Sequence, residues 1–330
     1  MNRHKTKRYT AAQWSQLAAL LEEWPLKHGA GYANCPTKGS ADLTLSRVGN
    51  VLRNPQSVPL IAQRDELVTG FAALSALPWD SELLGVSAAR LDYLVARGSY
   101  AEQYQIKLVL LNEVLAQATV QGIQHVSVRL DASDLSGLHL LEHAGFISVD
   151  AIITFALDVK SLPPGPVDSG ISIRIAGPSD GEATARLARK AYVYDRFHSD
   201  PALPLERSDD LHAAWLRNSC AGLAADVVVL AEDKDGLLGF VTGKLQRDTK
   251  AHLGKLIATI VLVATDQRAR GRGVARKTTA AAVDWFRQQG ADIVEVGTQL
   301  RNISASRLYQ RCGFDLVGSS VSLRKLLKDI

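Results

Sequence analysis

The heptapeptide LYQRCGF at residues 308–314 decides the fold, because a close copy of it, LLEHAGF, stands at residues 140–146. The glycines of the two copies, Gly145 and Gly313, lie 168 residues apart. The same offset aligns three further segments of the two halves: residues 92–96 with 260–264, 106–121 with 274–289, and 126–130 with 294–298. Self-similarity at one fixed offset indicates a repeated structural unit. The sequence therefore predicts two copies of one module.

A proline- and glycine-rich segment separates the two copies. Residues 161–170 contain three prolines and two glycines, which exclude a regular helix and a central strand there. We therefore expect a domain over residues 1–160, a linker over 161–170 and a second domain over 171–330. In each domain strands first pair as a meander and then alternate with helices. This order predicts an α/β fold with a mixed, mostly antiparallel sheet and helices on both faces.

The second half shows this order most clearly. Hydrophobic periodicity and turn residues predict the following elements: a strand over 171–176, helices over 181–192 and 211–218, a hairpin over 227–246, a long apolar strand over 256–265, a helix from about Arg272, a strand over 293–297, a helix over 304–312 and a strand over 314–323.

The composition is typical of a folded globular protein. Of the 330 residues 46% are hydrophobic and 22% are charged, which excludes a disordered chain. The net charge of +4 is too small to indicate a nucleic-acid partner, and the apolar runs are far shorter than the ~20 residues of a membrane span. The three cysteines do not have the spacing of a metal site or a redox pair. We expect a cytoplasmic protein without a signal peptide, a bound metal or a membrane contact, and the oligomeric state stays open.

The segment TDQRARGRGVA at residues 265–275 carries the clearest chemistry. Gly271 and Gly273 have no side chains, so several backbone N–H groups can surround an anion at the start of the helix that follows. Five of the 38 basic residues fall between Arg268 and Lys277. A Walker loop and a Rossmann fingerprint both require other spacings. A solvated basic turn or an RNA-binding Arg-Gly segment is the remaining alternative, but an apolar strand leading into an amphipathic helix favours a phosphate site.

The segment RGRGVA at 270–275, together with NISASRLYQRCGF at 302–314, resembles the GNAT superfamily of acyl-CoA N-acyltransferases. The resemblance covers about the last 160 residues well and the first half weakly. Gln267 and Thr265 depart from the residues that many members have there. The resemblance implies two tandem GNAT-like modules and acetyl-CoA, or another short acyl-CoA, as co-substrate. It assigns the pantetheine arm to the backbone from Val263 to Thr265 and to Asn302, and the pyrophosphate to Arg270, Gly271, Arg272, Gly273, Val274 and Ala275.

Tyr309 is implied to be the general acid. Attack of an amine on a thioester expels a thiolate, and a phenol can protonate that thiolate when it lies within hydrogen-bond reach. The alternative is that Tyr309 only packs between helix and sheet. The general base is not identifiable from the sequence: Glu295, His198, Asp195 and an ordered water all remain candidates.

The first half has lost these residues. At the same offset, residues 270–275 align with EQYQIK at residues 102–107, so that both glycines are replaced and Glu102 brings a negative charge. Asn302 aligns with Asp134 and Tyr309 with Leu141. We therefore expect that the first copy does not turn over acyl-CoA and has a structural role.

The acceptor is expected to bind in the variable region after residue 190. Residues 192–201, followed by Asp209 and residues 215–219, resemble the dTDP-fucosamine acetyltransferase group, and residues 79–84 resemble a segment of the same group. Arg196 and His198 are candidates for a diphosphate, and Trp215 is a candidate for stacking on a ring. This favours transfer to a nucleotide-linked amino sugar. The alternatives are a small amine, an antibiotic or a peptide N-terminus as acceptor, or a non-catalytic module that binds acyl-CoA.

Overall fold

The computed structural model describes residues 4–27, 32, 36–161 and 170–327. The chain folds into two compact units, one formed by Met1–Ala151 with Ser319–Ile330 and the other by Ile152–Gly318. These units differ from the expected domains over 1–160 and 171–330. Residues 162–169, which make up most of the expected linker, lie outside the described residues.

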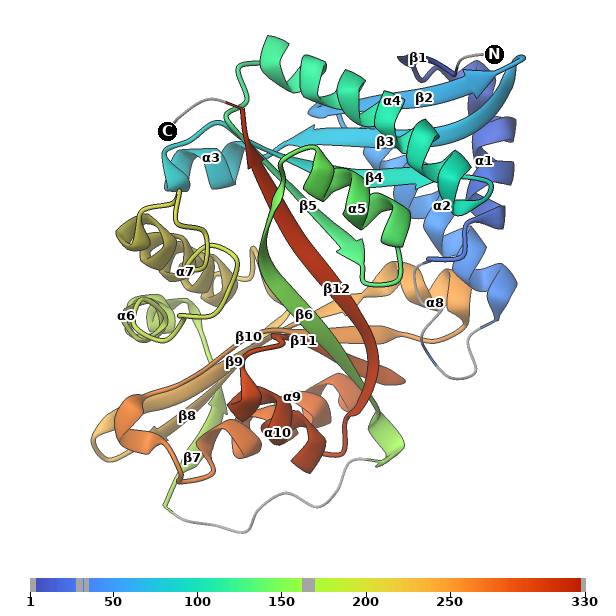
Figure 1. Ribbon diagram of the computed structural model, residues 1–330. Helices are drawn as coiled ribbons and strands as arrows, with labels where there is room; N and C mark the ends of the chain where they lie inside the picture. The colour runs from blue at the N-terminus through green and yellow to red at the C-terminus, as the bar shows by residue number, and fades with distance from the viewer. Residues whose placement is uncertain (1–3, 28–31, 33–35, 162–169, 328–330) are drawn as a thin grey trace. The chain divides into compact units, whose positions relative to one another are not determined.

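Six strands of the described chain form the sheet of the second unit (Figure 1). They lie in the order β7 (Ser172–Ile175), β8 (Val227–Asp233), β9 (Gly236–Gln246), β10 (Ile257–Thr265), β11 (Ile293–Gln299) and β6 (Ile147–Asp158). Strands β10 and β11 run parallel, and the other neighbouring strands run antiparallel. The sheet is therefore mixed and mostly antiparallel, as the sequence predicts.

Helices cover both faces of this sheet (Figure 1). They are α6 (Gly181–Ala188), α7 (Leu205–Cys220), α8 (Arg247–Leu253), α9 (Val274–Gln288) and α10 (Ile303–Arg311). On one face Phe286 of α9 packs in a buried cluster with Val294 of β11. On the other face Ala188 of α6 and Leu216 of α7 pack in a cluster with Phe240 of β9. Full burial of one such large apolar side chain contributes about 1.5–3 kcal/mol.

The helix expected over 181–192 ends four residues early, at Ala188. The amide groups of Lys190 and Ala191 donate to the carbonyl groups of Leu187 and Ala188, three residues back. Such tighter bonds satisfy the last carbonyl groups of a helix and end it. As a result Tyr192 lies in the loop between α6 and α7.

The first unit repeats the strand order of the second. Its strands are β1 (Lys5–Arg8), β2 (Ser57–Arg64), β3 (Leu67–Ala76), β4 (Ala88–Ala96), β5 (His125–Asp131) and β12 (Asp315–Leu326), in that order across the sheet. Its helices are α1 (Trp14–Glu23), α2 (Thr37–Arg53), α3 (Pro78–Leu84), α4 (Tyr100–Val120) and α5 (Leu135–His143). Strands β4 and β5 are the parallel pair. The two units therefore share one architecture, and the expected repeat is confirmed.

The last strand of each half completes the sheet of the other unit. Strand β6 follows α5 of the first half, and its residues 152–158 pair with β11. Strand β12 follows α10 of the second half, and its residues 320–326 pair with β5. The expected boundary at 160 assigns each of these strands to the half that encodes it. Hydrophobic pattern shows that a strand exists but not which sheet edge it joins, because that choice depends on the three-dimensional arrangement.

This exchange predicts how fragments behave. A fragment of residues 171–330 lacks β6, so the edge of β11 is left without its partner, whereas a fragment of residues 152–318 retains all six strands of the second unit. We expect cooperative thermal unfolding, followed by circular dichroism, for fragment 152–318 and an aggregating or non-cooperative product for fragment 171–330. Equal melting temperatures for the two fragments would contradict the exchange.

Candidate active site

The loop between β10 and α9 has the geometry of an anion site. Gly271 and Gly273 adopt φ values of +80° and +79°, in the left-handed region that favours glycine. A Cβ atom at either position would find no neighbouring atom within 4 Å, so the space beside the loop is open to a ligand. Gly273 is the N-cap of α9, and the first N–H groups of a helix have no partner within the helix. Together with the helix dipole, these groups attract a negative charge.

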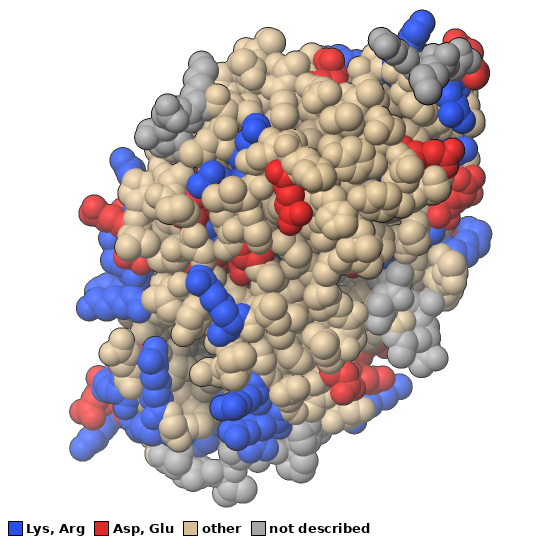
Figure 2. Space-filling model, in the orientation of Figure 1, with Lys and Arg blue, Asp and Glu red and all other residues tan. Residues whose placement is uncertain are grey.

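The arginines around this loop fall into two sets. Arg272 pairs with Asp233 at 3.0 Å, and Arg268 donates to the carbonyl oxygen of Leu237 at 3.0 Å, so these two hold the loop against the β8–β9 hairpin. Arg270 and Arg276 have no ion-pair partner among the residues that the structure describes. Figure 2 shows Lys and Arg gathered over the part of this unit that carries β7, β8 and α9. The charges of Arg270 and Arg276 are thus the ones left for an anionic ligand.

Strands β10 and β11 part beside the loop. Their pairing ends at Ile260 and Val296, although β10 continues to Thr265 and β11 to Gln299. A bulge between Ile260 and Leu262 shifts the register of β10 against β9 at the same point. Backbone groups that lose a sheet partner need another one. Val263 and Thr265 lie on this parted length.

Tyr309 lies on helix α10 of the second unit, and Asn302 is the N-cap residue of the same helix. The Asn302 side chain caps the helix by accepting from the Ala305 amide at 3.2 Å. Tyr309 is only 3% exposed, and its ring lies 6.0 Å from that of Phe155 and 5.8 Å from that of Phe314. Burial raises the pKa of Tyr309 above its ordinary value, which keeps the phenol protonated. Its hydroxyl has no hydrogen-bond partner among the described residues, so Tyr309 is a core residue that still has a proton to donate.

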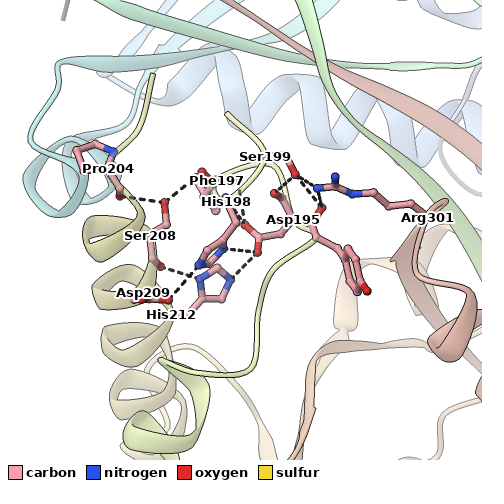
Figure 3. Close-up of polar contacts among 10 residues, drawn as sticks. Asp195, Phe197, His198, Ser199, Pro204, Ser208, Asp209, His212 and Arg301 are labelled. Carbon is pink, nitrogen blue, oxygen red and sulfur yellow. Dashed lines mark hydrogen bonds and ion pairs between the residues drawn. The ribbon is translucent and has the colours of Figure 1, made fainter. Parts of the chain in front are cut away.

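The loop after α6 and helix α7 together hold a network of two histidines and two aspartates, shown in Figure 3. His198 lies between two carboxylates, with Nδ1 2.6 Å from Asp195 and Nε2 3.1 Å from Asp209. His212 of α7 lies beside them, with Nδ1 2.9 Å from the carbonyl oxygen of Ser208 and Nε2 3.8 Å from Asp195.

The two histidines differ in charge because their partners differ. Burial alone would lower the pKa of His198, but the bonds to Asp195 and Asp209 outweigh it and raise that pKa. Burial lowers the pKa of His212, so its ring is neutral. Burial opposes ionisation of Asp195, but the bond to His198 prevails and lowers its pKa. Both nitrogens of His198 are thus engaged by carboxylates, which weighs against the expected contact of this residue with a diphosphate.

Ligand atoms of Asp195, His198 and His212 lie within 4.8 Å of one another, close enough for one metal ion to reach all three. The carboxylate of Asp195 already contacts His198 and also accepts from the Phe197 amide at 2.9 Å. A metal ion would have to displace the proton that joins Asp195 to His198. We therefore describe the cluster as a hydrogen-bond network.

Arg301 was missed by the sequence analysis, although it connects the acceptor loop to the start of α10. Its guanidinium donates to the carbonyl oxygen of Tyr194 at 3.0 Å and to the Ser199 hydroxyl (Figure 3). Of the expected acceptor residues, Arg196 lies 4.6 Å from the centre of the Phe197 ring, and Trp215 is half-buried with its ring 6.3 Å from that of His212. A lone arginine between a strand and a helix gives no periodic signal from which this contact could be predicted.

Glu295 lies on β11, on the face opposite to the one that Val294 and Val296 present to α9. It accepts hydrogen bonds from the Thr259 hydroxyl at 2.7 Å and from the Gln246 amide. Burial raises the pKa of Glu295 to about 7. A carboxyl group with this pKa can exchange a proton near neutral pH.

The first unit has the same parted strands but a different loop. The pairing of β4 with β5 ends at Leu91 and Val128. Helix α4 begins at Tyr100, which aligns with Arg268, so the residues that would form the loop are helical. Ser99 and Glu102 close a capping box over the N–H groups that a phosphate would need.

A buried ion pair replaces the remaining site residues of the first unit. The ammonium group of Lys107, which aligns with Ala275, contacts Asp134 at 2.5 Å and the Ser136 hydroxyl at 2.9 Å. Asp134 aligns with Asn302, and Leu141 stands where the second unit has Tyr309. In the first unit these polar side chains form hydrogen bonds and an ion pair with one another. At the aligned positions of the second unit, hydrogen-bond donors have no partner among the described residues.

The mixed sheet, the parted parallel strands and the glycine-rich helix start define the fold class as that of an acyltransferase domain. Residues 189–314 match the sequence model of the Acetyltransferase (GNAT) family. This match covers less than half of the chain; together with the relatives named next, it supports a transferase enzyme with a GNAT-type domain, and enzymes of this class use acetyl-CoA and an amine acceptor. Among the described residues, the helices are too short or too polar to cross a membrane.

Three similar proteins illustrate the relationship. The chain is 28% identical to the spore coat polysaccharide biosynthesis protein SpsD of Bacillus subtilis, over 72% of this chain and 76% of that protein. It is 23% identical to the dTDP-fucosamine acetyltransferase of Escherichia coli, over 73% of this chain and 93% of that enzyme. A solved tandem GNAT protein from the clavulanic acid biosynthesis pathway has the same fold, with a TM-score of 0.58 and 14% identity, and covers 98% of both chains.

The charge of His198 makes a testable contribution to stability. Its pKa in the folded state is raised above the unfolded value near 6.5, so its stabilising effect is fully present below about pH 6.5 and is lost as pH rises through the folded-state pKa. We expect His198→Gln to lower the melting temperature more at pH 6 than at pH 9, by about 2–4 °C, the shift that about 1 kcal/mol produces in a domain of this size.

The control is His252→Gln, because His252 has no ion-pair partner among the described residues. Its effect on the melting temperature should be small and the same at both pH values. A loss in His198→Gln that grew with pH would contradict the charged state of His198.

Proposed function

We propose that this enzyme transfers an acetyl or another short acyl group from its CoA thioester to the primary amine of a nucleotide-linked amino sugar. The observation that carries the proposal is the parting of β10 from β11 beside Tyr309, a buried residue whose hydroxyl has no hydrogen-bond partner among the described residues. The names of the two curated relatives, a spore coat polysaccharide protein and a dTDP-fucosamine acetyltransferase, support a sugar acceptor.

The second unit would hold the acyl-CoA. The N–H groups from Gly271 to Ala275 and the charges of Arg270 and Arg276 would bind the pyrophosphate, because they meet at an open helix start. The backbone from Val263 to Thr265 would bind the pantetheine arm, with Asn302 placing α10 beside it.

The reaction forms one bond and breaks one. The amine nitrogen attacks the thioester carbonyl carbon, the C–N bond forms, and collapse of the tetrahedral intermediate breaks the C–S bond. Tyr309 gives its proton to the leaving thiolate, and the proton lost by the amine passes to a base. Glu295 is the favoured base among the candidates, because its pKa of about 7 suits the task, whereas both ring nitrogens of His198 contact carboxylates and the pKa of Asp195 is lowered.

The amine acceptor would lie against the loop after α6. Arg196 and Arg301 carry positive charges on or beside this loop and are the residues that we propose for a nucleotide diphosphate. Trp215 is proposed to contact a ring of the acceptor. A small amine, an antibiotic or a peptide N-terminus is the alternative acceptor.

Turnover tests both the acceptor and the acid. Incubation with acetyl-CoA and a panel of dTDP- and UDP-amino sugars, simple amines and peptides should release free thiol with a sugar nucleotide. Tyr309→Phe should lower kcat at least 100-fold, because the thiolate loses its proton donor, with acetyl-CoA affinity nearly unchanged. Tyr104→Phe, which removes a phenol from the first unit, should leave kcat unchanged. Thiol release with amines but with no sugar nucleotide would move the acceptor to the alternative class.

The number of cofactor sites is a separate prediction. Titration calorimetry of the whole chain should give one acetyl-CoA per chain, since Lys107 and the α4 capping box close the first unit. Gly273→Ala should weaken binding at least tenfold, because a Cβ atom is strained at positive φ and enters the anion space. The matched control is Gln105→Ala at the aligned, exposed position of the first unit. Two binding sites per chain would contradict the closed first unit.

A further inference from the structure

Tyr192 presents a buried hydroxyl that no described group satisfies. Its oxygen is one of four buried side-chain polar atoms without a hydrogen-bond partner among the described residues, together with atoms of Ser40, Arg97 and Thr279. Leaving a polar group buried and unpaired costs free energy, so such a group calls for an explanation. One explanation is that a ligand provides the missing partner.

The ring of Tyr192 is held in place from one side. It stacks on His212, with the ring centres 4.3 Å apart and the planes inclined by 21°. His212 is itself fixed by its bond to the Ser208 carbonyl oxygen. The Tyr192 ring also packs against the buried cluster that contains Leu216 and Leu262. The hydroxyl therefore occupies a defined position.

That position is at the parted strands. The N–H group of Val263 faces the Tyr192 oxygen without closing a hydrogen bond, and the phenol of Tyr309 and the carboxylate of Asp195 are near enough to act on it electrostatically. Burial, with these two groups, raises the pKa of Tyr192 well above its ordinary value. Tyr192 therefore remains a hydrogen-bond donor at neutral pH.

Two donors thus face the same place. The Val263 N–H group points toward the Tyr192 oxygen, and the proton of the Tyr192 hydroxyl has no acceptor among the described residues. A carbonyl oxygen entering between them would accept from both. The thioester that the proposed reaction brings to this length of β10 carries one such oxygen, and that oxygen becomes negatively charged when the amine attacks.

We propose that Tyr192 is a second catalytic residue, whose hydroxyl donates a hydrogen bond to the thioester carbonyl oxygen and to the oxyanion formed from it. The assignment rests on the proposed acyl transfer. It gives the two phenols different roles, with Tyr192 as hydrogen-bond donor to the oxyanion and Tyr309 as proton donor to the leaving sulfur. As the C–N bond forms, the carbonyl π electrons move to the oxygen, where Tyr192 stabilises them and keeps its proton. As the C–S bond breaks, Tyr309 gives its proton to the sulfur.

The test is Tyr192→Phe, which removes only the hydroxyl. We expect kcat to fall at least tenfold with the acceptor that the wild type uses, while the melting temperature stays the same or rises, because an unpaired buried oxygen is deleted. Calorimetry gives a readout that needs no acceptor: the preference for acetyl-CoA over CoA should decrease in Tyr192→Phe, since CoA lacks the carbonyl group.

Thr279→Val is the matched control. It also deletes a buried, unpartnered hydroxyl, on α9, but it should change neither kcat nor the preference for acetyl-CoA. Wild-type kcat together with wild-type preference in Tyr192→Phe would overturn the assignment of Tyr192 and leave the proposed function standing. A wild-type chain that binds neither acetyl-CoA nor CoA would overturn both.

Discussion

The end of pairing between β10 and β11 is the constraint on which the rest of the second unit depends. Parallel strands that stop bonding at Ile260 and Val296, yet continue for several residues, leave backbone groups that must find another partner. Loop 265–273 and the start of α9 begin where β10 ends, so the open anion space adjoins the parted length. Tyr309 and Tyr192 bring two protonated phenols to the same region. The dipole of α9, the glycine conformations of the loop and the unpaired hydrogen-bond donors thus all lie at the same candidate site.

The first unit shows that the parted strands alone do not make a site. Its strands separate at the corresponding residues, Leu91 and Val128. There α4 starts at Tyr100, without the pair of glycines that precedes α9, and the ion pair between Lys107 and Asp134 is buried. Removing one partner of such a pair leaves an uncompensated buried charge, at a cost of about 3–5 kcal/mol. Single substitutions in this pair are therefore strongly disfavoured. The two units share one backbone architecture, but the polar groups at this place are paired with one another in the first unit and accessible to a ligand in the second.

Local patterns were sufficient for much of the fold and for the glycine-rich loop before α9. The repeat around Gly145 and Gly313, the strand and helix periods and the Gly271–Gly273 spacing all predicted elements that the structure contains, because turn chemistry and hydrophobic period act over a few residues. The exchange of β6 and β12 was not predictable, because either strand could complete either sheet. The early end of α6, and with it the placement of Tyr192 in a loop, depended on backbone bonds that leave no mark in composition.

The sequence by itself determined that the chain is a repeated α/β module with one glycine- and arginine-rich loop before a helix, since these features depend on residue type at fixed spacing. Only the tertiary structure decided which groups face one another. His198 came to lie between two aspartates that raise its pKa, Glu295 became a buried carboxyl with a pKa of about 7, and Tyr192 came to lie across from Val263 and Tyr309. Protonation and hydrogen bonding depend on burial and on neighbours distant in sequence, and folding alone brings those neighbours together.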